Sequence, residues 1–150
     1  MLDKYYSLTK TLILSGIQCE KKLWFDLNDK IKLKDKAIFR SGNRFNDVVR
    51  KHYGEGLDLS DEKEHQIVIE KTKEAIQPDN INVIYEAGFL FKKTFIRADV
   101  LIKKDNQWTM LEAKASTAVK DINISDLAIQ SFIVKNSGLD VICNKIIHIN

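Results

Sequence analysis

Residues 97–114 read RADVLIKKDNQWTMLEAK, and the fold of the chain can be worked out from this stretch. Two apolar runs are separated by the polar residues 103–106, a pattern that predicts a β-hairpin. Three charged side chains interrupt the runs: Asp99 lies in the first, and Glu112 and Lys114 end the second. Charged side chains inside strands lower stability. We therefore expect these residues to have a chemical function, and a metal-dependent active site is the leading hypothesis.

Further strands and a helix are predicted around this hairpin. Residues 81–91, 95–102 and 108–115 have the composition of three successive strands, and the short links between them predict an antiparallel meander. A helix is expected to follow from residues 121–125 to about Asn136, with Gly138 just beyond its end. Residues 140–149 are predicted to form a last strand.

Helices are predicted for most of the first 76 residues. Ser7 and Thr9 are candidate N-caps of one helix that runs to about Asn28. A second helix is expected over residues 37–53, and a third begins with a cap at residues 60–62, after a short strand at 57–59. Cys19 lies in the first helix and is expected to be a small buried apolar residue. The predicted fold class is α/β (α+β) with a mixed central sheet.

The composition describes an ordinary globular protein. The 150 residues are 44% hydrophobic and 30% charged, enough for one domain over residues 1–150 with a substantial core. The chain has no run long enough to span a membrane and no secretory signal, and its two cysteines are too few for a disulfide framework. We expect a cytoplasmic protein with reduced thiols. The stop directly after a strand is consistent with a fragment of a longer protein.

Positive charge is concentrated at the front of the chain. Residues 1–53 hold 12 Lys and Arg against 6 Asp and Glu, while residues 54–150 hold 12 against 15. A basic front half is suited to contacts with phosphate. Lysines on exposed helix faces also serve solubility, and the composition does not choose between these explanations.

The charged residues of the hairpin can form one site. Side chains alternate along a strand, so Glu112 and Lys114 share a face, and the hairpin brings Asp99 close to Glu112. Two carboxylates and the carbonyl of Ala113 make a hard oxygen site suited to Mg²⁺ or Mn²⁺. Lys114 would hold or deprotonate an attacking water, or neutralise charge on phosphate. Glu86, on the preceding strand, would add a third carboxylate.

Structural roles are the alternatives for these residues. The three hairpin charges could form a salt bridge at the surface edge of the sheet, and Glu86 could be a structural partner of Lys114 or Arg97. Histidines 52, 65 and 148 have no partner at metal-ligand spacing and are expected at the surface or rim. Trp24 and Trp108 are expected in the core or at its rim rather than stacked on bases.

The spacing of these residues resembles a known motif. Ala98-Asp99, twelve intervening residues and Glu112-Ala113-Lys114 resemble the PD-(D/E)XK nuclease motif, with Ala98 in place of proline. The predicted order of helix, three strands, helix and strand resembles the αβββαβ core of the restriction-endonuclease-like fold. The additional N-terminal helices would precede this core.

Other stretches resemble the RecB-like branch, which includes CRISPR-associated exonucleases and related uncharacterised bacterial nucleases. They are residues 8–24, Tyr85-Glu86-Ala87, residues 114–117 and residues 126–130, which end in Gln130. The resemblance implies metal-dependent hydrolysis of phosphodiester bonds. It implies Asp99 and Glu112 as metal ligands, and Lys114 as the catalytic lysine.

The same resemblance implies that Glu86 is an auxiliary acid and that Gln130 orients the substrate or the lysine, although Gln130 could also fill a polar gap. Two positions depart from the family pattern. Asn46 stands where a histidine often follows a helix glycine by four residues, and Val134 stands where a tyrosine often follows the glutamine. The first change removes a possible metal ligand, and the second weakens the expected contact with DNA.

An iron–sulfur cluster, which some members bind through one early and three late cysteines, is not expected within this chain. Cys19 matches the early position, but only Cys143 follows it.

Three functions follow from these observations. The first is a Mg²⁺- or Mn²⁺-dependent deoxyribonuclease, exonuclease or endonuclease, whose DNA substrate could be single-stranded or have free ends. The second is a catalytically silent nucleic-acid-binding or assembly module that retains the nuclease fold. The third is a restriction-type or RNA-directed endonuclease on the same scaffold. The sequence identifies no helicase or nuclease-complex partner.

Overall fold

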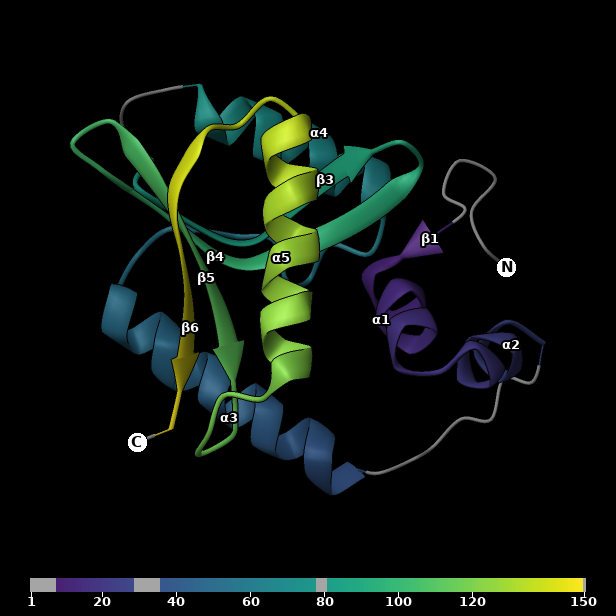
Figure 1. The fold of residues 1–150 in the computed structure, drawn as a ribbon. Helices are drawn as coiled ribbons and strands as arrows, with labels where there is room; N and C mark the ends of the chain where they lie inside the picture. Colours follow the sequence, from purple (N-terminus) through teal and green to yellow (C-terminus); the bar gives the residue numbers. More distant parts are fainter. Residues whose placement is uncertain (1–7, 29–35, 78–80, 150) are drawn as a thin grey trace.

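The computed structural model describes residues 8–28, 36–77 and 81–149, and for residues 36–43 it describes the backbone alone. This part of the chain forms a mixed α/β structure around a six-stranded sheet of order β2-β3-β4-β5-β6, with β1 beside β4 (Figure 1). Along the chain the elements are β1 (Leu8–Thr9), α1 (Lys10–Gln18), α2 (Glu20–Asn28), α3 (Lys36–Tyr53), β2 (Leu57–Asp58), α4 (His65–Ile76), β3 (Val83–Phe91), β4 (Thr94–Lys104), β5 (Gln107–Lys114), α5 (Asp121–Asn136) and β6 (Val141–His148).

The predicted antiparallel meander is confirmed. β3 pairs with β4 and β4 with β5, both antiparallel, whereas β6 pairs with β5 in parallel after the crossover through α5. Each hairpin turns in two residues with positive φ, Lys92-Lys93 in the first and Asp105-Asn106 in the second. Two left-handed residues are typical of the type I′ turn, whose twist matches that of the strands it joins.

Helices cover both faces of the sheet (Figure 1). Leu101 belongs to the same core cluster as Ile133 of α5, whereas its neighbour Val100 belongs to the cluster of Val49 of α3. Neighbouring strand residues point to opposite faces, so α5 and α3 lie on opposite sides of the sheet. Gly138 has a φ of +99° directly after the C-cap of α5, as expected for a helix that ends in a left-handed residue.

The predicted first helix is wrong in one respect. Thr9 caps α1 as expected, because its side chain accepts a hydrogen bond from the N–H of Leu12. The helix ends at Gln18, however, and the extended backbone of Cys19 separates it from α2. Lys22 then donates to Ser15 Oγ at 2.6 Å, which folds α2 back against α1. Cys19 is exposed, so the expectation that it is buried is also wrong.

The start of the third helix also differs from the prediction. Residues 60–62 form a turn, in which Ser60 N donates to Asp58 and Glu62 N donates to the carbonyl of Leu59. The helix, α4, begins only at His65. Its predicted cap residue Glu62 instead accepts a hydrogen bond from the N–H of Lys63.

The two tryptophans differ in their surroundings. Trp108 lies in the core at 5% exposure, as expected, whereas Trp24 is 57% exposed on α2. Within the described residues, no helix has the length and apolar character needed to cross a membrane.

Replacing Lys93 by glycine should stabilise the protein. Lys93 adopts a φ of +63°, a conformation that costs a residue with a side chain roughly 1–2 kcal/mol but costs glycine little. We expect Lys93→Gly to raise the free energy of unfolding by about 1 kcal/mol in chemical denaturation. The matched control is Lys104→Gly, an exposed strand residue outside the left-handed region, which should lower stability. Destabilisation by both variants would contradict the turn geometry.

Candidate active site

The sheet opens along one edge of β4. β3 pairs with the other edge along nearly the whole strand. On the open side, β1 pairs with Thr94 and Phe95, and β5 pairs with the segment from Val100 to Lys104. Residues 96–99 of β4 pair with neither strand. Beyond this point residues 112–114 of β5 pair with β6, so β4 and β5 diverge.

Asp99 lies where β4 and β5 separate. Its Oδ2 accepts a hydrogen bond of 2.7 Å from the backbone N–H of Ala113. The carboxylate thus replaces the strand carbonyl that this N–H would otherwise meet. Asp99 is thereby held at the mouth of the opening. The hydrogen bond gives Ala113 a role through its N–H, and the predicted role of its carbonyl stays a prediction.

Glu86 faces Asp99 across β3 and β4, because the register pairs Tyr85 with Val100. Its φ of +57° is rare for a residue with a side chain and costs roughly 1–2 kcal/mol. Tyr85 belongs to the core cluster of α3, whereas Ala87, two residues on, belongs to the cluster of α5. Residues two apart on a regular strand share a face, so the regular alternation of side chains between the two faces is interrupted at Glu86, next to the opening.

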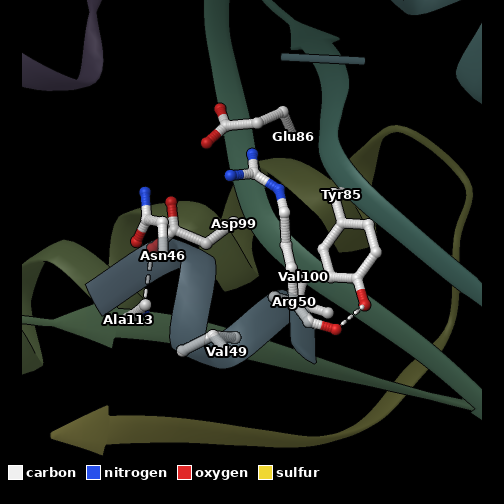
Figure 2. Close-up of a pocket in the computed structure, with 8 residues that line it drawn as sticks. All are labelled: Asn46, Val49, Arg50, Tyr85, Glu86, Asp99, Val100 and Ala113. Atoms are coloured by element: carbon white, nitrogen blue, oxygen red, sulfur yellow. Dashed lines mark hydrogen bonds between the residues drawn. The ribbon is translucent and has the colours of Figure 1, made fainter. Parts of the chain in front are cut away.

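A small cavity lies between Glu86 and α3 (Figure 2). Its volume is about 10 Å³, at the lower limit of the space that can hold one water molecule. The amide of Asn46 lies beside the carboxylate of Asp99, and the guanidinium of Arg50 points toward Glu86 (Figure 2). The lining residues are Asn46, Val49, Arg50, Tyr85, Glu86, Asp99, Val100 and Ala113.

On the α5 side, a network of charged and polar groups surrounds Glu112. Lys114 Nζ lies 2.6 Å from Glu112 Oε1 and 2.6 Å from Asp126 Oδ2. Gln130 Nε2 donates to Glu112 Oε2 at 2.5 Å and to Asp126 Oδ1 at 2.9 Å. Glu112 is 2% exposed and Gln130 is fully buried. Lys114 and Glu112 therefore share a face of β5, as expected, and are held there by two residues one turn apart on α5.

A second lysine reaches this network from the N-terminal arm, the segment formed by β1, α1 and α2 (residues 8–28). Lys10 follows β1 directly, and its Nζ lies 3.0 Å from Asp126 Oδ1 and 3.4 Å from Glu112 Oε1. β1 pairs with the start of β4 and β5 with its far end, so Lys10 reaches the opening between them from the β1 end.

The charges of the site are unevenly compensated. Burial, together with the negative charge of Glu112, raises the pKa of Asp99 to about 7. Burial alone would lower the pKa of Lys114, but the Glu112 and Asp126 carboxylates outweigh it and raise that pKa above its ordinary value. Lys114 is therefore an ammonium ion at neutral pH. Burial also raises the pKa of Glu86.

The structure brings together most of the predicted residues. Lys114 and Gln130 contact Glu112 directly, and Asp99 is close enough to feel its charge. Glu112 is 2% exposed on a strand between β4 and β6, which excludes a salt bridge at the surface edge of the sheet. Glu86 lines the small cavity on the α3 side of the sheet, and Arg97 and Arg50 are its strongest electrostatic partners.

Two members of the cluster were missed by sequence reasoning. Asp126 lies four residues before Gln130, so helical spacing places both on one face of α5, and this signal could have found it. Lys10 is separated from Glu112 by 102 residues, and only the pairing of β1 with β4 brings it to the site. No local sequence pattern predicts a contact between residues so far apart in the chain.

The two departures from the family pattern have different consequences. Asn46 lines the cavity beside Asp99, where its amide oxygen is a possible ligand or hydrogen-bond acceptor. Val134 is fully buried in the core, so position 134 offers no surface for contact with DNA. A buried amide oxygen, Gln130 Oε1, accepts no hydrogen bond from the described residues, and such atoms usually bind water or a ligand.

The oxygen donors of the site suit a divalent cation that keeps part of its water shell. No three His, Cys, Asp or Glu side chains of the described residues form a ready-made cluster, so the site is not an all-protein cage. Mg²⁺ is commonly held by only one or two carboxylates, with water at its other positions. Glu112 supplies a buried carboxylate and Asp99 a half-buried one, and burial together with the negative charge of Glu112 raises the pKa of Asp99, an effect that a cation between the two would relieve. The residues therefore fit a hard divalent cation.

A larger cavity of about 500 Å³ lies between α1, α5 and the β3–β4 hairpin. It is mostly apolar and therefore poorly suited to phosphate. Its lining residues are Ile13, Phe91, Lys92, Thr94, Ala128, Ile129, Phe132 and Ile133.

In comparisons with known proteins, no family model and no curated protein matches the chain.

Replacing Asp99 by asparagine should stabilise the metal-free protein at neutral and alkaline pH. The pKa of Asp99 is raised from 3.8 to about 7 in the folded state, so the folded protein binds more protons than the unfolded chain between these values. Stability therefore falls as pH rises through this window. We expect Asp99→Asn to gain about 1–2 kcal/mol at pH 8 and little near pH 4.

Chemical denaturation in EDTA between pH 4 and pH 8 measures this gain. Glu74→Gln, at an exposed position of α4, is the control and should show no such pH dependence. An Asp99→Asn protein that is less stable than the parent at pH 8 would refute the electrostatic account.

Proposed function

We propose that the chain is a metal-dependent nuclease domain that hydrolyses phosphodiester bonds in DNA. The observation that carries the proposal is the Lys114 ammonium bound to Glu112 beside the opening between β4 and β5, with the carboxylate of Asp99 near enough for the charge of Glu112 to act on it. The element order α4-β3-β4-β5-α5-β6 supports it, because this is the αβββαβ order expected of the PD-(D/E)XK superfamily and its RecB-like branch.

Asp99 and Glu112 would hold Mg²⁺ or Mn²⁺, with Glu86 and the Ala113 carbonyl as further oxygen donors. When bound there, the cation would polarise the phosphate and lower the pKa of a coordinated water. The bond from the Ala113 N–H to Asp99 Oδ2 fixes the direction of that carboxylate and leaves Oδ1 for the cation. Gln130 fixes Glu112 through Oε2, whereas Oε1 of Glu112 accepts hydrogen bonds from Lys114 and Lys10.

Lys114 would act as a cation in this mechanism rather than as a general base. Its ammonium is held by Glu112 and Asp126, both at 2.6 Å, and the neighbouring carboxylates favour its charged form. A fixed positive charge of this kind orients the attacking water or stabilises the charge that develops on phosphate. Of the roles predicted for this lysine, the geometry favours these two over removal of the proton from water.

The second candidate function is a silent nucleic-acid-binding or assembly module. It is favoured by the exposed apolar surface of α2, a helix with no buried residue on which Trp24, Phe25 and Leu27 are all exposed. Such surfaces often mark an interaction site. A module of this kind would bind DNA or a protein without metal-dependent turnover.

Cleavage assays separate the two functions. We expect Mn²⁺- or Mg²⁺-stimulated cleavage of DNA by the parent protein, and a loss of at least about 100-fold in Asp99→Asn and Lys114→Met. The first variant removes a ligand of the cation, and the second removes a positive charge that acts on the water or the phosphate. Circular dichroism should show that both variants fold. Lys104→Met, at an exposed position of the β4–β5 hairpin, is the control and should cleave normally.

The substrates should include single- and double-stranded DNA, RNA, linear ends and closed circles. Absence of metal-stimulated cleavage on every DNA form would leave the silent module as the better account. Cleavage of RNA or of closed circles alone would favour the endonuclease alternatives.

A further inference from the structure

Lys10 is the cation that the N-terminal arm brings to the buried carboxylates. Its side chain is 22% exposed, whereas those of its partners Glu112 and Asp126 are 2% and 5% exposed. The two carboxylates also bind Lys114, so two anions and two cations form a group with no net charge. Both oxygens of Glu112 accept hydrogen bonds in this arrangement.

The charge of Lys10 also acts beyond its two ion-pair partners. It acts on Asp99 and Glu86 as well as on Glu112 and Asp126. Lys10 therefore compensates the same carboxylates that the proposed function assigns to a divalent cation. Both oxygens of Glu112 already accept hydrogen bonds, so a divalent cation that binds this carboxylate must displace a donor, and an ammonium group that stays beside it would repel the cation.

Of the two lysines, Lys10 is the one that can leave. Lys114 is fixed on β5 where this strand pairs with β6, and both of its contacts are at 2.6 Å. Lys10 makes longer contacts, and its arm is lightly attached, since α1 buries only Ser15, α2 buries no residue and β1 pairs with β4 over two residues.

We infer that Lys10 is the resident counter-ion of the site and that a divalent cation replaces it, so that cation binding releases the first turn of the arm. This inference rests on the proposed function. By linkage the coupling is reciprocal: seating of the arm lowers the affinity for the cation by the same factor by which the cation loosens the arm. Lys10 thus acts on the cation through Glu112 and Asp126, as a positioning residue.

Calorimetric titration with Mn²⁺ tests the coupling directly. We expect Lys10→Met to bind Mn²⁺ about tenfold more tightly than the parent protein, since the competing charge is gone. The matched control is Lys71→Met, which removes an ion pair outside the arm, the 2.9 Å contact with Glu62, and should leave the affinity unchanged. Equal or weaker binding by Lys10→Met overturns the inference.

Amide hydrogen exchange of the parent protein gives a second test that needs no variant. Saturating Mn²⁺ should speed exchange in residues 10–18 and leave β5 protected. Unchanged or slower exchange in residues 10–18 of the loaded protein overturns the inference, even where Lys10→Met fails to fold.

The two proposals fail in different ways. Binding of Mn²⁺ that is lost in Asp99→Asn but insensitive to Lys10 overturns the inference and leaves the proposed function standing. No binding of Mn²⁺ by the parent protein or by Lys10→Met overturns both.

Discussion

Compensation of buried negative charge is the constraint on which this structure depends. Glu112 and Asp126 are almost fully buried, and each contacts two lysines that come from distant parts of the chain. Buried charges are tolerated only when they are paired and hydrogen-bonded. The pairing of β1 with β4 brings Lys10 to one side of the cluster and the β4–β5 hairpin brings Lys114 to the other. The fold and the site therefore share one electrostatic requirement.

Asp99 departs from this rule. It is half-buried next to the charge of Glu112, and Glu86 opposite it sits in a strained backbone conformation. Both features lower stability, and both lie at the single place where β4 pairs with neither β1 nor β5. Unfavourable features concentrated in one place are typical of functional sites, where stability is lost in exchange for activity. This concentration is the physical reason to regard the opening as an active site.

Much of the second half of the structure could be predicted from the sequence, because its signals are local. Short polar links predicted the meander, and strand alternation predicted that Glu112 and Lys114 share a face. The errors lie where distant contacts decide. The break at Cys19 depends on the packing of α2 on α1, and the late start of α4 depends on a turn at residues 60–62. Lys10 and the interrupted alternation at Glu86 have no local signature, since both follow from how strands pair.

A crystal structure of the protein soaked with Mn²⁺ tests the central claim most directly, because the anomalous signal of the ion marks its position. The account predicts a peak between the carboxylates of Asp99 and Glu112, near the Ala113 carbonyl. An opening that stays free of Mn²⁺ at saturating concentration, with Lys10 still bound to Glu112 and Asp126, would contradict it.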